Sequence, residues 1–228
     1  TAANSAVRYL TINAMQETSA LSKLSSGSRI TSASDDAAGL AISTRISSDI
    51  TTLQQAATNA AQATSILQTA DGGASNISDI LARMKSLASE SASGTVADSS
   101  RAYINSEFTQ LKGEIDSIAT GTRYSSQSLL DGSSVFSSGV AVLVGSTSAD
   151  TITITLTNLT ASSLGVTSLD VSTLSAATSA MSALDSAIDS VSSARAEIGA
   201  QESRFNFSAD SISTQTQNLQ SANSAIKD

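Results

Sequence analysis

The sequence contains no cysteine, no histidine, no proline and no tryptophan among its 228 residues, and only 3% of the residues are aromatic. Without cysteine and histidine the chain has no thiol nucleophile, no imidazole base, no disulfide and no ordinary zinc site. Carboxylate pairs, or a hydroxyl with a lysine base, are the catalytic groups that remain. We therefore expect a protein that is not an enzyme and that holds no cofactor or metal.

The charges and the hydropathy exclude two further classes. The net charge is -8 and the lysines and arginines are scattered singly, whereas a nucleic-acid surface needs a clustered basic face. No apolar run reaches the roughly 18 residues of a membrane span, and the N-terminus has no apolar core of a signal peptide. The pattern is already running at the first residue and stops at "SAIKD", so we expect a chain trimmed at both ends.

The absence of proline and the few aromatics favour long helices with narrow alanine and leucine seams. From Ile42, alternating steps of four and three residues reach Ala88, and only Asp49 on this path is polar. This pattern predicts one long helix that packs along its length. Its seam includes Ile42, Ile46, Leu53, Leu67 and Leu81.

A second seam runs through the C-terminal part, where every seventh residue is apolar. Arg195 and Glu202 fall beside it, and we expect them at its rim or paired, because an unpaired charge in a dry core is costly. A shorter helix is predicted over 104–118, with Asp98 or Ser99 as its cap. The C-terminal seam consists of Leu184, Val191, Ile198, Phe205, Ile212, Leu219 and Ile226.

The helical period disappears in the middle of the chain. "TITITLT" from Thr151 alternates with period two, as does part of "VAVLVG" from Val140, which predicts a hairpin or a small sheet. The predicted fold is therefore mainly α with a small β insertion: an elongated antiparallel bundle of long helices. The expected segments are a helical region over 1–130, the insertion over 131–175, and a helix over 176–228 that packs on the first region.

The stretch "LSSGSRITSASDDAAGLAI" predicts a joint between two helices. Gly27 ends the first helix, and Ser32 or Ser34 caps the second, with Asp35 three residues after Ser32 as in a capping box. Asp35 and Asp36 are expected at the positive end of the helix dipole. As neighbours on a helix they point about 100° apart, so they make a poor metal chelate.

The same residues carry a family resemblance. "LSSGSRITSASDDAAGLAISTRI" resembles the N-terminal signature of bacterial flagellins, and "QTADGGASNISDILARMKSLASESASGT" and "INSEFTQLKGEIDSIATGTRY" continue it. It returns in "LDSAIDSVSSARAEIGAQESRF" and runs to the last residue. One departure is Ser125-Ser126 in place of an Asn-Gly turn; Asn-Gly favours positive φ and Ser-Ser does not, which leaves the turn geometry open.

The resemblance implies a structural subunit that self-assembles into the extracellular flagellar filament for motility. The implied partners are other subunits, the flagellar export apparatus and its chaperone. With the inner core trimmed, we expect a monomer or a weak oligomer. By match to the family's spoke, which joins the inner core to the outer rod, the joint residues are Gly27, Arg29, Ser32, Asp35 and Asp36.

Three alternatives stay open. A hook-filament junction protein shares the terminal helical signatures, although the dense joint motif favours a flagellin. A surface adhesin would bind polysaccharide on the insertion, where Tyr124 and Phe136 are the only aromatics nearby. A host Toll-like receptor recognises some flagellins, and Arg83, Leu87 and Glu107 match its contacts; ordinary packing and a solvated face are the preferred interpretation of these three.

Overall fold

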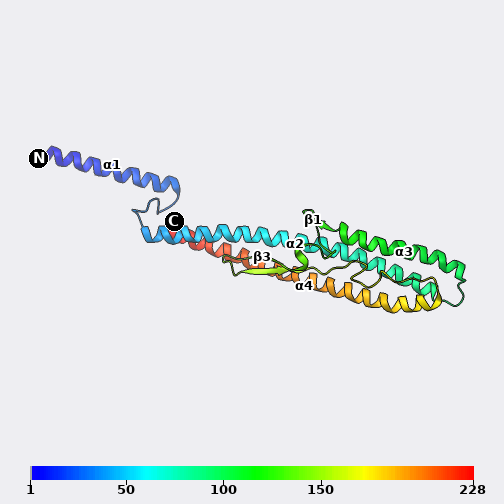
Figure 1. Cartoon of the computed structure of the whole chain (residues 1–228). Helices are drawn as coiled ribbons and strands as arrows, with labels where there is room; N and C mark the ends of the chain where they lie inside the picture. The colour runs from blue at the N-terminus through cyan, green and yellow to red at the C-terminus, as the bar shows by residue number, and fades with distance from the viewer. Residues whose placement is uncertain (1) are drawn as a thin grey trace. The chain divides into compact units, whose positions relative to one another are not determined.

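The computed structural model describes residues 2–228, and these fold mostly into helices (Figure 1). The helices are α1 (Ala2–Ser26), α2 (Ala37–Ser91), α3 (Asp98–Gly121) and α4 (Leu174–Lys227). No proline interrupts them, so α2 and α4 run for 55 and 54 residues. The predicted fold class, mainly α with a small β insertion, is confirmed.

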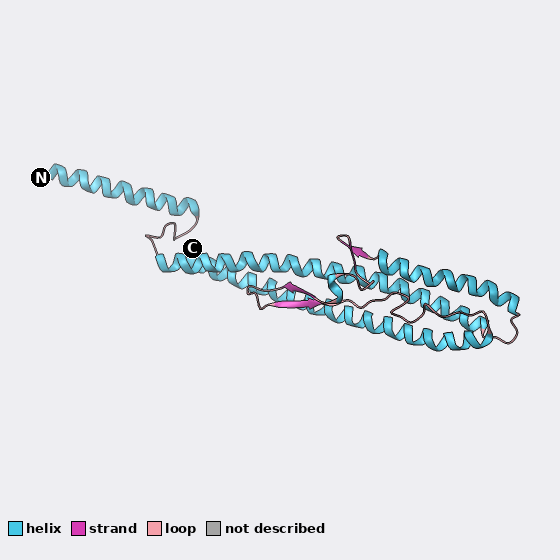
Figure 2. Ribbon diagram, in the orientation of Figure 1, coloured by secondary structure: helices cyan, strands magenta, loops and turns pink. Residues whose placement is uncertain are grey.

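Two short antiparallel hairpins lie between α3 and α4 (Figure 2). The first pairs β1 (Arg123–Tyr124) with β2 (Gln127–Ser128). The second pairs β3 (Val140–Leu143) with β4 (Thr151–Ile154) in the register Val140 opposite Ile154. The alternating segments thus form the predicted hairpin, although β4 ends at Ile154 before the alternation does.

The chain divides into two compact units that cut across the predicted segments. The larger unit is Thr58–Ala209, and the smaller unit joins the described residues before Thr58 to Asp210–Asp228. Each long helix contributes to both units, because α2 and α4 extend across the boundaries.

The core of the larger unit follows the two seams. Leu67 and Leu81 of α2 are fully buried, and α3 adds Phe108 and Ile115 on the face predicted for it. Arg195 and Glu202 are half-buried at the seam's edge and paired as expected: Arg195 Nε lies 2.8 Å from Asp71 Oδ1, and Glu202 accepts from Gln68 at 2.9 Å. The buried residues of α4 in this core include Leu184, Val191, Ile198 and Phe205.

Residues 155–173, here called the return segment, have no regular secondary structure and yet belong to the core. The helices hold its main chain with their side chains. Asp116 accepts from the Ala161 amide at 2.8 Å, and Asn105 accepts from the Val171 amide at 2.9 Å. Lys112 donates to the Leu169 carbonyl at 2.7 Å. The buried apolar side chains of the return segment are Leu156, Leu159, Ala161, Leu164, Val166 and Val171.

The smaller unit pairs the start of α2 with the end of α4. Leu53 and Ile212 are buried, whereas Ile46, Leu219 and Ile226 are only half-buried.

The prediction that the α2 seam begins at Ile42 is wrong. Ile42 is 53% exposed, and Ser43 takes its place with no exposed surface. Steps of three and four residues back from Leu53 pass through Ile50 and Ile46 to Ser43, so the stripe is shifted by one position. Burial of the Ser43 hydroxyl is tolerated because it donates to Asn223 Oδ1 at 2.7 Å.

Candidate functional site

The N-terminal helix α1 carries an exposed stripe of apolar side chains. Val7, Leu10, Leu21 and Leu24 are between 61 and 84% exposed, and no described residue of α1 is buried. Together with Ala14 they share one face of the helix, because their spacing follows the helical period. An exposed apolar stripe of this length marks a surface for interaction with another molecule.

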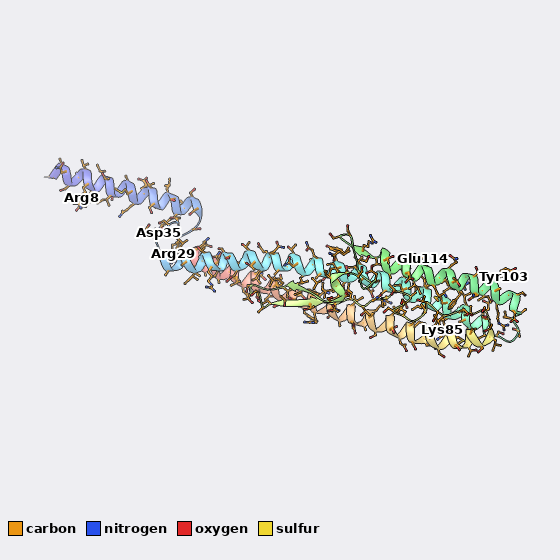
Figure 3. The ribbon with its side chains drawn as sticks, in the orientation of Figure 1. Arg8, Arg29, Asp35, Lys85, Tyr103 and Glu114 are labelled. Carbon is orange, nitrogen blue, oxygen red and sulfur yellow. The ribbon has the colours of Figure 1, made fainter. Side chains whose placement is uncertain are left out.

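The joint, residues 27–36, connects α1 to α2, and Asp35 organises it (Figure 3). Gly27 follows α1 with a φ of 68°, the left-handed conformation that glycine adopts freely. Asp35 Oδ2 accepts hydrogen bonds from the amides of Thr31 and Ser32 at 3.2 and 3.0 Å, and from both hydroxyls. Its Oδ1 lies 2.9 Å from Lys23 Nζ. The contact with Lys23 and the donors of Thr31 and Ser32 hold the pKa of Asp35 well below its usual range.

The cap of α2 is Asp36, so the prediction of Ser32 or Ser34 is wrong. Asp36 Oδ1 accepts from the Gly39 amide at 2.9 Å, as an N-cap side chain does. The helix begins at Ala37, so Ser32 lies too far ahead to reach its amides. The Ser32 to Asp35 pair forms a turn in the joint and not a capping box, because Asp35 also stands before the helix.

Sequence reasoning missed Gly39. A Cβ at this position would lie 2.5 Å from Asp36 Oδ2 and 2.8 Å from Ile30 Cδ1. The cap and the buried Ile30 can therefore approach the first turn of α2 only because residue 39 has no side chain. The available signal was a glycine in the first turn of an otherwise helical pattern.

The joint also binds the end of α4. The Arg29 amide donates to the Lys227 carbonyl at 2.6 Å, and Arg29 Nη2 donates to the Ile226 carbonyl at 3.1 Å. Carbonyls in the last turn of a helix lack partners within the helix, and a cation is favourable there. Arg29 is thus a structural residue of the smaller unit.

A second arginine, which sequence reasoning also missed, closes the turn between α2 and α3. Arg101 is 5% exposed, and it donates to the Ser91 carbonyl at 2.8 Å and to the Ser93 carbonyl at 2.9 Å. The predicted cap at Asp98 or Ser99 is wrong: the N-cap is Ala97, which makes no side-chain bond, and Asp98 instead pairs with Arg101 at 2.7 Å. The arginine stands seven residues before Phe108 on the buried face of α3, a place where a charge is not expected.

The residues matched to receptor contacts differ in access. Arg83 Nη2 and Glu107 Oε1 lie 2.6 Å apart, with side chains 54 and 46% exposed. Leu87 is only 2% exposed, so it packs in the core as the preferred interpretation has it, and its side chain offers no surface contact. It belongs to the apolar core of the larger unit.

The β1–β2 turn has the geometry of an Asn-Gly turn without its residues. Ser125 and Ser126 have φ angles of 47° and 70°, and two central residues with positive φ characterise a type I′ hairpin turn. The turn geometry left open by the sequence is thus decided. For residues other than glycine this conformation costs roughly 1–2 kcal/mol each.

Neither a cluster of metal-ligating side chains nor a membrane-spanning helix is found among the described residues. Within 2–228 no group of three or more His, Cys, Asp or Glu side chains could hold a metal ion. None of the helices in this range is both long and apolar enough to cross a bilayer.

Two family models match the chain. The bacterial flagellin N-terminal helical region matches residues 1–135, and the bacterial flagellin C-terminal helical region matches residues 181–228. A flagellin of Halalkalibacterium halodurans is 36% identical over 99% of this chain and 83% of its own length. A flagellin of Listeria monocytogenes is 34% identical over 96% of this chain and 81% of its own. A flagellar filament 30.7 kDa core protein of Treponema maltophilum is 34% identical over 97 and 82%.

Solved structures agree with these matches. The crystal structure of Bacillus cereus flagellin has a TM-score of 0.62 at 29% identity, covering 73% of this chain and 94% of its own. A putative flagellar hook-associated protein from Vibrio parahaemolyticus has a TM-score of 0.69 at 16% identity, covering 84 and 99%, and shows the fold alone. The fold is thus shared with both structures. This chain belongs to the bacterial flagellins, extracellular structural subunits that assemble with one another into the flagellar filament.

Proposed function

We propose that this subunit joins its neighbours in the filament through the apolar stripe of α1, and that the joint transmits that contact to α2 and α4. The observation that supports the proposal is the exposure of Val7, Leu10, Leu21 and Leu24 on a helix with no buried described residue. Burying one such side chain contributes about 1.5–3 kcal/mol. A stripe of four therefore supplies a large share of an interface.

The joint residues have a supporting role in this proposal. Asp35 holds the turn and the end of α1 through Lys23, and Asp36 starts α2. Gly27 permits the change of direction, and Arg29 binds the end of α4. In this proposal the predicted spoke residues orient α1, and the apolar stripe of α1 contacts the neighbouring subunits.

Charge substitutions on the stripe test this proposal. Leu10→Asp and Leu21→Asp, made in the gene of a host that lacks its own flagellin, should abolish filaments in electron micrographs and abolish swimming. Ser19→Asp is the matched control, because Ser19 lies nine residues after Leu10, on the opposite side of the same helix. Filaments of normal length from Leu10→Asp would refute the role of the stripe.

We also propose export in an unfolded state through the flagellar export apparatus with a chaperone. The chain has no cysteine, so no disulfide stands in the way of unfolding. Secretion of the subunit into the medium should stop in a host whose export apparatus is inactivated. The proposed role is structural, without catalysis, and the family is a structural one.

For the division of the chain, we propose that residues 131–175 are the segment that varies between relatives. The family models stop at residue 135 and resume at residue 181, which supports this boundary. The return segment nevertheless fills the core, so variation is expected between Val144 and Asp150, at the tip of the second hairpin.

Three finer roles are proposed only with their tests. Receptor recognition would use Arg83 and Glu107, because Leu87 is buried; Arg83→Ala should then lower receptor binding.

A polysaccharide site on the insertion would lack an aromatic platform, since Phe136 is 8% exposed, and a glycan-binding assay tests for such a site. For a hook-filament junction role, the copy number in sheared filaments is the test: few copies would indicate a junction protein.

A further inference from the structure

The larger unit has an apolar pocket on its surface beside the second hairpin. It measures about 260 Å³ and lies between α2 and the β3–β4 hairpin. Ala63 and Ile66 of α2 form one side, and Phe136, Val142 and Ile154 form the other. Gln62 stands exposed at its rim and can offer an amide to a polar group. The pocket therefore suits a side chain with an apolar body and a polar tip.

The larger unit also has a solvent-exposed side chain with an apolar body and a polar tip. Tyr103 of α3 is 80% exposed, the most exposed aromatic residue in the part of the chain that the structure describes. In Figure 3 its side chain lies near the start of α3, pointing away from the bundle. An exposed tyrosine loses little conformational entropy on binding because it has only two side-chain torsions.

The pocket and Tyr103 lie toward opposite ends of the larger unit. Tyr103 is one turn from Glu107, which pairs with Arg83 of α2. Along α2, Gln62 and Arg83 are separated by about 30 Å at 1.5 Å per residue. One copy cannot fill its own pocket with its own Tyr103, but a second copy displaced along the same direction can.

We propose that Tyr103 of one subunit inserts into this pocket of a second copy of the chain, as a head-to-tail contact within the filament. The inference rests on the proposed assembly function. A knob and a pocket on different parts of one molecule make a heterologous contact, which generates an open polymer when the rotation between copies does not close a ring. The tyrosine ring packs against Ile66 and Phe136, and its hydroxyl meets the Gln62 amide at the rim.

Tyr9 of α1 and Phe207 of α4 are also exposed rings, and Phe207, at 73% exposed, is the competitor that belongs to the larger unit. It lies on α4 near Gln201, which binds the main chain of Thr155, directly after the pocket residue Ile154. Phe207 and the pocket would then lie at the same end of the unit. Two copies could each insert Phe207 into the other's pocket and form a closed dimer. A filament subunit needs the open arrangement, which favours Tyr103.

The size of the contact agrees with its proposed place. One aromatic side chain buries about 150–250 Å². A stable complex of two proteins buries at least about 1,200 Å². The contact alone therefore cannot hold two free subunits together, and it acts where the stripe of α1 and lateral neighbours add their area. The contact fixes the axial offset between neighbouring subunits, whereas the other surfaces supply most of the binding free energy.

Disulfide trapping tests the contact directly, because the chain has no cysteine of its own. Filaments of a variant with both Tyr103→Cys and Gln62→Cys, treated with a mild oxidant, should yield a ladder of covalent oligomers on a denaturing gel. Each subunit then links two neighbours, whereas Tyr103→Cys alone gives no ladder. The matched control pairs Tyr103→Cys with Ser186→Cys, an exposed position on α4, and should also give no ladder.

Intact filaments without a ladder would overturn this contact and leave the proposed function in place. An equal ladder from the Ser186→Cys control would overturn it as well, because the linkage would be unspecific. If the parent chain does not add to filament seeds, the proposed function fails and the contact falls with it.

A second measurement does not depend on the cysteines. Tyr103→Ala should raise the critical concentration for elongation from filament seeds about tenfold or more, whereas Tyr103→Phe should keep most of the affinity. Phe207→Ala should leave the critical concentration unchanged. A large effect of Phe207→Ala with none of Tyr103→Ala would assign the pocket to Phe207 and overturn the proposal.

Discussion

At the scale of single residues, a few polar side chains determine where the helices of this flagellin begin and end. Asp36 caps the start of α2, Arg101 takes up the carbonyls after its end, and Arg29 takes up those at the end of α4. Each satisfies main-chain groups that a helix leaves without partners. In a chain with so few large side chains, the ends of the helices are set by such contacts.

Among these polar side chains, we expect substitution of Arg101 to reduce stability most. Arg101→Met should lower the free energy of unfolding by about 2–4 kcal/mol, because the carbonyls of the buried Ser91 and the half-buried Ser93 lose charged donors. Arg101→Lys should recover only part of this, because one ammonium cannot reproduce the fork. Urea denaturation followed by circular dichroism measures both. The exposed Arg204→Met is the control, and an equal loss there would contradict the assignment.

The strained turn predicts a substitution that stabilises the protein. Ser126→Gly should raise the free energy of unfolding by about 1 kcal/mol, because glycine adopts a φ of 70° without penalty. The same change at the exposed Ser182 of α4 should lower it by about 0.5 kcal/mol, because glycine is a poor helix former. Thermal unfolding of the two variants gives opposite signs if the turn is as described, and equal signs if it is not.

At the scale of elements, α4 shows how one helix presents a buried and an open face. Phe205 has no exposed surface, and Phe207, two residues later, is 73% exposed. Residues two apart on a helix point about 200° apart, so the seam's spacing assigns one ring to the core and the other to the surface.

This pair of phenylalanines makes a matched test of the seam. Phe205→Ala should cost about 3–5 kcal/mol of unfolding free energy, because a cavity replaces a fully packed ring. Phe207→Ala should cost less than about 0.5 kcal/mol, as is usual at the surface. Denaturant titration compares the two, and similar losses would show that the seam is misplaced.

The joint between α1 and α2 is the element that responds to pH. The folded chain holds the pKa of Asp35 below the ordinary 3.8, so the ionised carboxylate stabilises the joint at neutral pH. This stabilisation is lost as the pH falls below about 4 and through the lower folded pKa. The amide resonances of Thr31 and Ser32, followed by NMR from pH 7 to 2, should therefore move mainly in the lower part of that range.

Two variants complete the pH experiment. In Asp35→Asn the two amide resonances should stay constant across the range, since no carboxylate titrates beside them. In Asp210→Asn, a change at an exposed position of α4, they should follow the parent curve. A midpoint near the ordinary pKa of an aspartate in the parent chain would argue against the contacts around Asp35.

At the scale of the whole molecule, burial is distributed very unevenly. The larger unit holds a continuous apolar core that includes the return segment, while α1 has no buried described residue. Most of the stability of a helix in a protein comes from packing of its apolar face, and α1 lacks such packing in the free subunit. The free subunit therefore has its buried apolar contacts in the larger unit, and α1 gains little stability from burial.

Hydrogen exchange should show this contrast. In the unassembled subunit, the α1 amides should exchange within seconds to minutes at neutral pH, whereas the amides of α3 around Phe108 and Ile115 should persist for hours or longer. In filaments the α1 amides should become protected. Equal protection of α1 and α3 in the free subunit would contradict this division of stability.

The amino-acid pattern alone is sufficient for the helices, the hairpin and the family. The seams at Leu53, Leu81, Leu184 and Phe205 depend on spacing within one helix, and the alternation in "TITITLT" depends on adjacent residues. Such local periodicities are visible in a sequence because each element repeats its own geometry. The same reasoning places Gly27 after the end of α1.

Only the tertiary structure decides which residues meet. Asn105 and Val171 are 66 positions apart, Arg29 and Ile226 are 197 apart, and no spacing rule connects them. The structure assigns the cap to Asp36, buries Arg101 and Leu87, and makes the insertion part of the core. The physical reason is that these outcomes depend on unpaired main-chain groups and apolar surface at points where distant segments cross, and the folded chain alone brings those points together.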